Sequence, residues 1–237
     1  MEAFGILGGW PGIAVCLGLV PAIGYWYWRK VWFFRNPRRV APAGEGLLSP
    51  ADGTVVYVQQ VPPHQRVITI KQGVAASIND IARADLVHPK VLVGVFMSPF
   101  SVHYNRAPLA GAVQFIRHYP AITKNRHMGA MHLRTLFGRT PRYAESLHIV
   151  QNERTVTRID GHFKGQAMTC HIVQIAGKSV NGIDSYVEVG DRLGRGDIFG
   201  MIRIGSQVDL VVPWLEGMRI RIKPGDKVRA GETVLIE

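Results

Sequence analysis

Two stretches of the chain share one pattern, GDRLGRGDIF at residues 190–199 and GDKVRAGETV at residues 225–234. Both have the form Gly-Asp-x-apolar-x-x-Gly-acid-x-apolar. A glycine followed by an acidic residue tolerates the tight backbone of a hairpin, so each stretch predicts a turn, a short apolar contact, a second turn and a strand. The pair therefore predicts a β-rich body with two turns of the hammerhead type.

The rest of the chain also has the texture of a β protein. Short runs rich in β-branched residues are bounded by Gly, Pro or Asn, and only Ser77–Ala84 is typical of a short helix. We expect a mainly β (α+β) fold, and both a sandwich and a partly closed barrel stay open. The expected strands are Thr54–Val58, Val67–Ile70, Val91–Phe96, Ala112–Ile116, Ser146–Val150, Thr169–Ile175 and Val208–Val212.

Paired hammerhead turns also occur in biotinyl and lipoyl carrier domains, which present a lysine at a hairpin tip between the two halves. No Met-Lys or Asp-Lys-Ala tip lies between Phe199 and Gly225. The repeat is therefore interpreted as part of the β body and not as a carrier.

The composition narrows the class of protein. The chain has 237 residues, of which 47% are hydrophobic and 19% charged, with 26 Gly and 14 Pro; this excludes a disordered chain and an ordinary helical bundle. The length fits one large domain, or one domain with an appendage. Cys16 and Cys170 are too few for a disulfide framework or a Cys-rich zinc site.

The N-terminal segment predicts membrane association. Residues 3–28 carry no charge, and aromatic and basic residues follow them, as at a membrane interface with positive charge on the cytoplasmic side. Pro11 and Pro21 interrupt the run, so an interfacial or re-entrant hairpin fits as well as a full span; the buried helix of a soluble protein is the alternative. A signal peptide is not expected, because Glu2 replaces the basic start and no small-x-small cleavage site precedes Arg29.

From this pattern we divide the chain into two parts. Residues 1–40 are expected to form a hydrophobic membrane anchor with a basic linker, and residues 41–237 a single catalytic domain. We expect the protein at the cell membrane, with the catalytic domain on the cytoplasmic side.

Three short segments carry residue types that can do chemistry. They are SPADG at residues 49–53, FMSPFSVHYNRAP at residues 96–108 and FGMIRIGSQVD at residues 199–209. Each alone has an ordinary structural explanation: an Asp that caps a turn, a hydrogen-bonded His, and a Gly-Ser turn.

Together and in this order, the segments resemble the phosphatidylserine decarboxylase family in its short bacterial and archaeal form. The resemblance covers most of the chain, and residues 190–209 are its most specific part. It also includes FFRNP at residues 33–37, NER at residues 152–154, QIAG at residues 174–177 and the closing residues 225–235.

The resemblance implies a proenzyme that cuts itself at the Gly205–Ser206 bond into residues 1–205 (the beta chain) and 206–237 (the alpha chain). Ser206 then becomes a covalent pyruvoyl group, and no metal or added cofactor is required. Ser206 resembles the nucleophile, His103 its base and Asp52 the carboxylate that orients the base. Gly205 leaves its own carbonyl open to attack, because it has no Cβ.

The implied reaction is the decarboxylation of phosphatidylserine to phosphatidylethanolamine and CO2. The amine of the substrate forms a Schiff base with the pyruvoyl group, which accepts the electrons left by CO2. His103 is the candidate that returns a proton to the carbon.

Two departures from the family pattern affect these roles. Longer members have His-x-x-His, whereas this chain has His103-Tyr104-Asn105-Arg106, so that His103 serves both steps or water helps. Arg106 is then a candidate to pair with the lipid phosphate or with the departing carboxylate. Gln207 follows Ser206 where the long form has Thr.

The net charge of +11 is concentrated in two blocks, +4 in residues 1–39 and +7 in residues 103–158. Residues 117–142 contain no acid and are broken by Pro and Gly, which predicts a long loop. We expect this loop to lie against an anionic bilayer and to guide the headgroup to Ser206; a solvated surface loop is the equal alternative. His127 and His132 are five residues apart, which is wrong for two ligands on one helical face, so no metal site is expected. The basic residues are Arg117, Lys124, Arg126, Arg134, Arg139 and Arg142.

Other functions remain as alternatives. A membrane-anchored serine hydrolase with the same triad would keep Ser206 as a free hydroxyl, and an archaetidylserine decarboxylase would share the headgroup chemistry. A non-enzymatic nucleic-acid or lipid-binding β module is less favoured, and no nucleic-acid partner is expected, because the aromatic residues cluster in the hydrophobic segment and not among the basic residues. The expected partners are phosphatidylserine, an anionic membrane surface and the two chains of the cut proenzyme; a homo-oligomer stays open.

Overall fold

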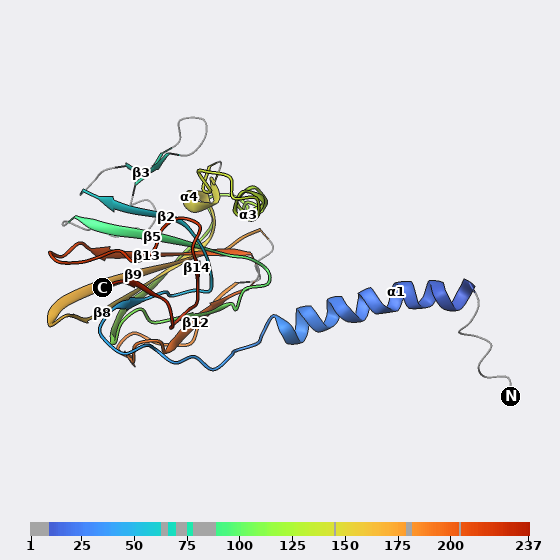
Figure 1. Ribbon diagram of the computed structural model, residues 1–237, viewed down its shortest axis with the longest axis horizontal. Coiled ribbons are helices and arrows are strands. Elements are labelled where there is room, and N and C mark those ends of the chain that lie inside the picture. Colours follow the sequence, from blue (N-terminus) through green and yellow to red (C-terminus); the bar gives the residue numbers. More distant parts are fainter. Residues whose placement is uncertain are drawn as a thin grey trace. The chain divides into compact units, whose positions relative to one another are not determined.

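The computed structural model describes residues 10–62, 66–69, 75–77, 89–144, 146–178, 182–203 and 205–237. The chain divides into two units, residues Met1–Pro37 and Arg38–Glu237, and the second is called the body below. Figure 1 shows the body as strands with a few short helices, which confirms the prediction of a mainly β fold.

The N-terminal unit is helical. Helix α1 (Trp10–Tyr27) contains Pro21 and runs into the π-helical turn η1 (Trp28–Trp32). Throughout the described ranges, no helix combines the length and the hydropathy that a bilayer crossing requires. The apolar side chains of α1 nevertheless point into solvent over most of its length: Ile13, Val15, Leu17, Leu19, Val20, Ile23, Tyr25, Trp26 and Tyr27 are all exposed.

The body is built on an antiparallel sheet of eight strands in the order β11-β7-β8-β9-β13-β5-β2-β14. In Figure 1 the strands β2, β5, β13, β9 and β8 run side by side. The strands are β2 (Gly53–Val61), β5 (Lys90–Met97), β7 (Gly111–Tyr119), β8 (Arg154–Phe163), β9 (Gln166–Ile175), β11 (Arg192–Leu193), β13 (Ser206–Pro213) and β14 (Lys227–Val228).

Three smaller sheets accompany it. Strand β1 (Leu47–Leu48) pairs with β15 (Val234–Ile236), and β12 (Ile198–Ile202) lies between β10 (Ile183–Ser185) and β6 (Tyr104–Arg106). The third sheet pairs β3 (Arg66–Thr69) with β4 (Ala75–Ser77).

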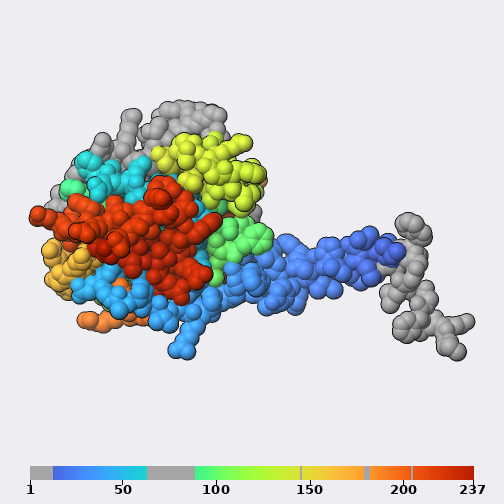
Figure 2. Space-filling model, viewed as in Figure 1, coloured from blue at the N-terminus to red at the C-terminus, as the bar shows by residue number. Residues whose placement is uncertain are grey.

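The two central strands, β5 and β13, are buried on both faces, which explains their nearly continuous apolar sequences. Val208, Leu210 and Val212 of β13 belong to the larger core. Val211 points the other way, into a second core that is covered by helices α3 (Gly129–Leu136) and α4 (His148–Gln151). Figure 2 shows the yellow-green segment that contains these helices beside the red C-terminal segment.

The two copies of the repeated pattern fold alike. In the first, Gly190 donates to the carbonyl of Val113 in β7 at 2.8 Å, and Val113 donates back to Asp191 at 2.9 Å. In the second, residues 225–226 make the same two bonds with Val55 of β2, at 2.8 and 2.9 Å. The prediction of paired hairpin turns is confirmed.

One glycine from each copy lies at the contact between them. Gly196 (φ +91°) and Gly231 (φ +72°) both adopt the left-handed backbone that other residues rarely adopt. A Cβ added to Gly231 would lie 3.5 Å from the Cα of Gly196. Since β11 and β14, which belong to the two copies, are opposite edges of the eight-stranded sheet, this contact brings its two ends together. The sheet is a curled half-barrel, so the partly closed barrel is the better of the two predicted architectures.

Two predictions about single elements are wrong. Ser146–Val150 is not a strand, because His148–Gln151 form α4, which buries His148 and Ile149. Its carbonyls at Ile149 and Val150 accept hydrogen bonds from the guanidinium of Arg154, a contact that a short apolar run does not reveal.

The basic stretch 117–142 is not one long loop either. Its start belongs to β7, and residues 129–136 form α3, because Met128 and Met131 are buried in the second core and hold the segment as a helix. The helix predicted over Ser77–Ala84 lies outside the described residues except for Ser77, the last residue of β4.

Candidate active site

The Gly205–Ser206 bond lies at the entry to the centre of the sheet. Ser206 is the first residue of β13 and pairs with Met97 of β5. Gly205 has a φ of +59°, and no atom lies within 4 Å of the place where a Cβ would stand. The glycine is therefore required by the backbone conformation, and its peptide is not crowded from that side.

The Ser206 side chain is fully buried. Its Oγ donates a hydrogen bond to Sδ of Met97 at 3.3 Å, and Nδ2 of Asn105 contacts the same sulfur at 3.8 Å. Asn105 is in turn fixed by Gln174, whose Nε2 donates to Oδ1 of Asn105 at 2.8 Å. A thioether is a weak acceptor, so the Ser206 hydroxyl can exchange this hydrogen bond for one to a stronger acceptor at little cost.

His103 is also fully buried and stands directly before β6. Its backbone carbonyl accepts a hydrogen bond from the amide of Ile202 at 3.3 Å, which places the His103 backbone beside the strand that leads to Ser206. Prolines at positions 99 and 108 flank the segment.

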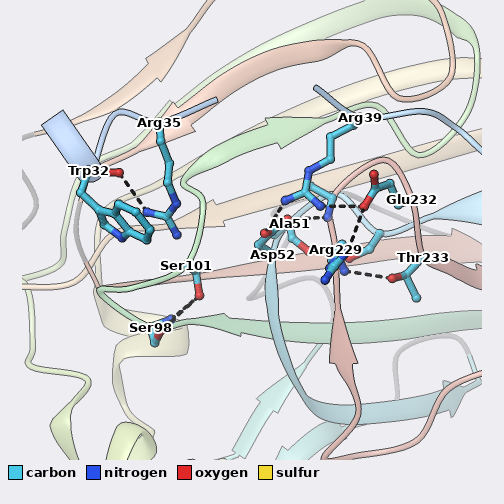
Figure 3. A network of polar contacts seen from close by, with 12 residues as sticks. Trp32, Arg35, Arg39, Ala51, Asp52, Ser98, Ser101, Arg229, Glu232 and Thr233 are labelled. Atoms are coloured by element: carbon cyan, nitrogen blue, oxygen red, sulfur yellow. Dashed lines mark hydrogen bonds and ion pairs between the residues drawn. The ribbon is translucent and has the colours of Figure 1, made fainter. Parts of the chain in front are cut away.

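Asp52 occupies the bend before β2. Its Oδ1 accepts from the amide of Ala230 at 2.7 Å, and its Oδ2 accepts from Nη2 of Arg39 at 2.8 Å; Arg39 also reaches Glu232 (Figure 3). Burial raises the pKa of Asp52 above its ordinary value, against the opposing effects of the Ala230 amide and Arg39.

Two of the three predicted catalytic residues flank one end of β5, and the third follows the loop that leaves that end. Phe96 of this strand pairs with Thr54 on one side and with Gln207 on the other, so the turn with Asp52 and the start of β13 flank the same strand end. The chain passes from that end into the loop that leads to His103. Asp52 accepts hydrogen bonds from Arg39 and Ala230, and Ser206 donates one to Met97. The relay from Asp52 through His103 to Ser206 therefore stays a prediction.

Arg106 has a structural contact in addition to its predicted role. Its Nη1 donates to the carbonyl of Gly196 at 2.9 Å, and Gly231 lies against its side chain. The side chain thus bridges the two copies of the repeat, with its guanidinium at Gly196 and its Cδ at Gly231, and burial lowers the pKa of the guanidinium. Binding of substrate by Arg106 stays a prediction.

A small cavity of about 160 Å³ opens beside Gly205. One wall of the cavity is apolar. There the ring centroids of His132 and Phe96 lie 5.9 Å apart. His127 and His132, whose spacing does not suit a metal site on a helical face, line this cavity together with Lys178. The remaining lining residues are Phe96, Pro99, Met128, Gly129 and Gly177.

A second, larger groove of about 480 Å³ runs along Asp52. His132 lines both spaces, so α3 forms a shared wall between them. The groove is also lined by Phe100, Thr135, Leu136, Lys227 and Arg229, among other residues.

A buried polar network, which the sequence reasoning missed, supports the start of β13. Nε2 of Gln207 donates to the hydroxyl of Tyr57 at 2.6 Å and to Oδ1 of Asp209 at 2.7 Å, and its Oε1 lies 3.2 Å from Nε2 of His148. Burial raises the pKa of Asp209 to about 7 and lowers that of His148 to about 4. Polar residues at positions 207 and 209 of an apolar strand were the available signal, because they share one face.

Comparison with known proteins identifies the family. The family model described as phosphatidylserine decarboxylase matches residues 26–236. The chain belongs to the phosphatidylserine decarboxylase family.

Individual relatives agree with this assignment. The chain is 34% identical to a protein of Aromatoleum aromaticum named phosphatidylserine decarboxylase proenzyme, over 97% of this chain and 93% of that protein. A protein of Nitrosomonas europaea with the same name is also 34% identical, with the same coverage. One from Azorhizobium caulinodans is 31% identical over 91% of this chain and 76% of its own length. The resemblance inferred from the motifs is confirmed, and with it the prediction of a decarboxylase.

Proposed function

We propose that the chain cuts itself at Gly205–Ser206 and then decarboxylates phosphatidylserine to phosphatidylethanolamine and CO2. The observation that carries the proposal is the left-handed Gly205 directly before a buried Ser206, at the edge of a cavity. Family membership supports the same reaction.

In the self-cleavage step, Oγ of Ser206 bonds to the carbonyl carbon of Gly205, its proton passes to His103, and the peptide C–N bond breaks. His103 gives the proton to the leaving nitrogen, so the product is an ester between Gly205 and Ser206 with a free amino group on Ser206. Loss of the Cα proton of Ser206 then expels the Gly205 carboxylate, and water converts the dehydroalanine into a pyruvoyl group with release of ammonia. A serine hydroxyl needs a base positioned in this way.

The start of β13 fits such a group. Position 206 is buried, its neighbour Gln207 is held by three side chains, and the strand is paired on both sides from Gln207 onward. When it is formed, the pyruvoyl group supplies a carbonyl that binds an amine and accepts the electrons left by CO2.

The cavity beside Gly205 suits the serine phosphate headgroup. Lys178, His127 and His132 can face its phosphate and carboxylate oxygens, while Phe96 and Met128 exclude water. His103 would return a proton to the carbon that loses CO2, and Asp52 would orient His103.

The N-terminal unit supplies a site for membrane attachment under this proposal. The exposed apolar side chains of α1 would be covered by lipid, with Arg29 and Lys30 at its end near the headgroups. We propose a location at the cell membrane with the body on the cytoplasmic side. Arg39, counted with the basic linker in the sequence analysis, instead binds Asp52 and Glu232 in the body.

The first experiment is an intact mass of the purified protein. We expect two chains, residues 1–205 and a fragment of 32 residues (237 − 205) whose N-terminus is blocked. Ser206→Ala should give one chain, because it lacks the nucleophile. A single chain of full mass from the parent sequence would overturn the mechanism and favour a serine hydrolase.

A further inference from the structure

Helix α3 has two faces of different character. On the inner face, Met128 and Met131 are buried in the second core. On the outer face and just beyond the helix, Leu133, Leu136 and Phe137 are 54%, 66% and 66% exposed. Large apolar side chains clustered at a surface in this way mark an interaction site.

The apolar surface continues onto the loop after β5. Phe100 is 66% exposed and lines the groove along Asp52 together with Thr135 and Leu136 of the helix. Four apolar side chains therefore project beside the candidate active site. We call Phe100, Leu133, Leu136 and Phe137 the apolar ridge.

The charge around the ridge indicates what covers it. Residues 117–142 contain six basic residues and no acid, and Lys124, Arg126 and Arg139 are exposed. Basic residues near an anionic lipid surface strengthen the binding of a protein to it. Apolar side chains in a basic field match the boundary of an anionic bilayer, in which the headgroups are negative and the acyl chains apolar.

The same helix forms a wall of the reaction site. Met128, Gly129 and His132 line the cavity beside Gly205, and His132 directly precedes the exposed Leu133. A surface that enters the bilayer at α3 would therefore bring the cavity to the depth of the lipid headgroups.

We propose that the apolar ridge inserts into an anionic bilayer and opens the Gly205 cavity toward the headgroup layer. The proposal rests on the proposed function for its substrate, but insertion itself depends only on the surface. A headgroup then reaches the cavity without the lipid leaving the membrane. This assigns to α3 a contact that is separate from that of α1.

The test places a fluorophore on the ridge. Phe137→Cys in a Cys16→Ser background is labelled with an environment-sensitive dye, since Cys170 is buried. Val189→Cys is the matched control, because Val189 is 62% exposed in the same body and lies outside the basic stretch. The probe is a vesicle of phosphatidylglycerol and phosphatidylcholine that carries nitroxide groups on its acyl chains.

We expect the emission at position 137 to shift to the blue on vesicles and to be quenched by the nitroxides, with neither change at position 189. High salt should weaken both effects. Equal behaviour at the two positions would overturn the proposal. A blue shift that depends on protein concentration and not on vesicles would also overturn the proposal. It would show that a second copy of the chain, and not lipid, covers the ridge.

The outcome is separable from that of the proposed function. The same labels in a Ser206→Ala background should still insert, although that chain stays uncut. Conversely, Leu133→Ser with Phe137→Ser should decarboxylate bilayer phosphatidylserine about tenfold more slowly. The same double variant should decarboxylate a short-chain phosphatidylserine in detergent at the parent rate. An equal loss of rate on both substrates would contradict the proposal.

Discussion

At the scale of single residues, Gly205 and Gln207 have different tasks on either side of Ser206. Gly205 allows the left-handed backbone, and Gln207 fixes the strand through Tyr57, Asp209 and His148. Ser206, the proposed nucleophile, donates its hydroxyl to the thioether of Met97. The site thus combines a rigid strand with a weakly bonded hydroxyl. This combination suits the proposed self-cleavage, in which the hydroxyl loses its proton.

Asp209 gives this network a pH dependence. Its pKa is about 7 in the folded chain against an ordinary value near 4, so the folded state holds the proton more tightly. The resulting stabilisation is full below pH 4 and is lost as the pH rises through 7. The free energy of unfolding of Asp209→Asn should therefore equal that of the parent near pH 4. At pH 8 it should be higher than that of the parent, by at most about 4 kcal/mol.

The measurement is urea unfolding at pH 4, 6 and 8 in the Ser206→Ala background, which keeps the chain in one piece. The amide introduced by Asp209→Asn would keep an oxygen that accepts from Gln207, so the comparison isolates the ionisation. A stability difference that does not change with pH would show that Asp209 stays ionised in the folded chain.

At the scale of elements, the contact between the two turns is held through Arg106. A Cβ on Gly231 would lie 2.8 Å from Cδ of Arg106, whose guanidinium is bonded to Gly196. Gly231→Ala must therefore displace Arg106 and weaken that bond, in addition to the backbone strain of its positive φ.

The matched control is Gly138, which has a similar φ of +64° with no atom within 4 Å of an added Cβ. Gly138→Ala should cost about 1–2 kcal/mol of the free energy of unfolding. Gly231→Ala should cost roughly 1–3 kcal/mol more, because it adds overpacking. Equal losses in urea unfolding would mean that Arg106 moves freely and does not hold the turns together.

The elements also show why the sequence predicts some parts and not others. The paired turns were predictable, because Gly and Asp determine them locally. Strand β8 was missed since Arg154, Arg158 and Asp160 interrupt its apolar pattern; in the structure the last two pair with each other and Arg154 binds α4. Helix α4 was taken for a strand because a short apolar run has no distinctive period.

At the scale of the whole molecule, the site is assembled from segments far apart in the sequence. The motifs suggested the roles of Asp52, His103 and Ser206, and the strand pairing places the turn with Asp52 and the start of β13 with Ser206 beside the same end of β5. The sequence could not reveal that α3 would wall the cavity, because this depends on how Met128 and Met131 pack into the second core.

The same pairing predicts the fate of the cut chain. The 206–237 fragment contains β13, which lies between β5 and β9 at the centre of the sheet, as well as β14 and β15, which pair with β2 and β1. The proposed cleavage after Gly205 would remove one peptide bond at the start of β13 and would leave these ladders and the buried Val208, Leu210 and Val212 in place.

We therefore expect the two fragments to co-elute in native size-exclusion chromatography, at the volume of uncut Ser206→Ala, and to separate only in denaturant. The fragment has too small a core to fold alone. Its removal would leave the paired edges of β5 and β9 without their partner, take Val208, Leu210 and Val212 out of the larger core, and unfold the remainder. Recovery of a soluble, folded 1–205 chain without its partner would contradict this account, because the centre of the sheet would then be dispensable.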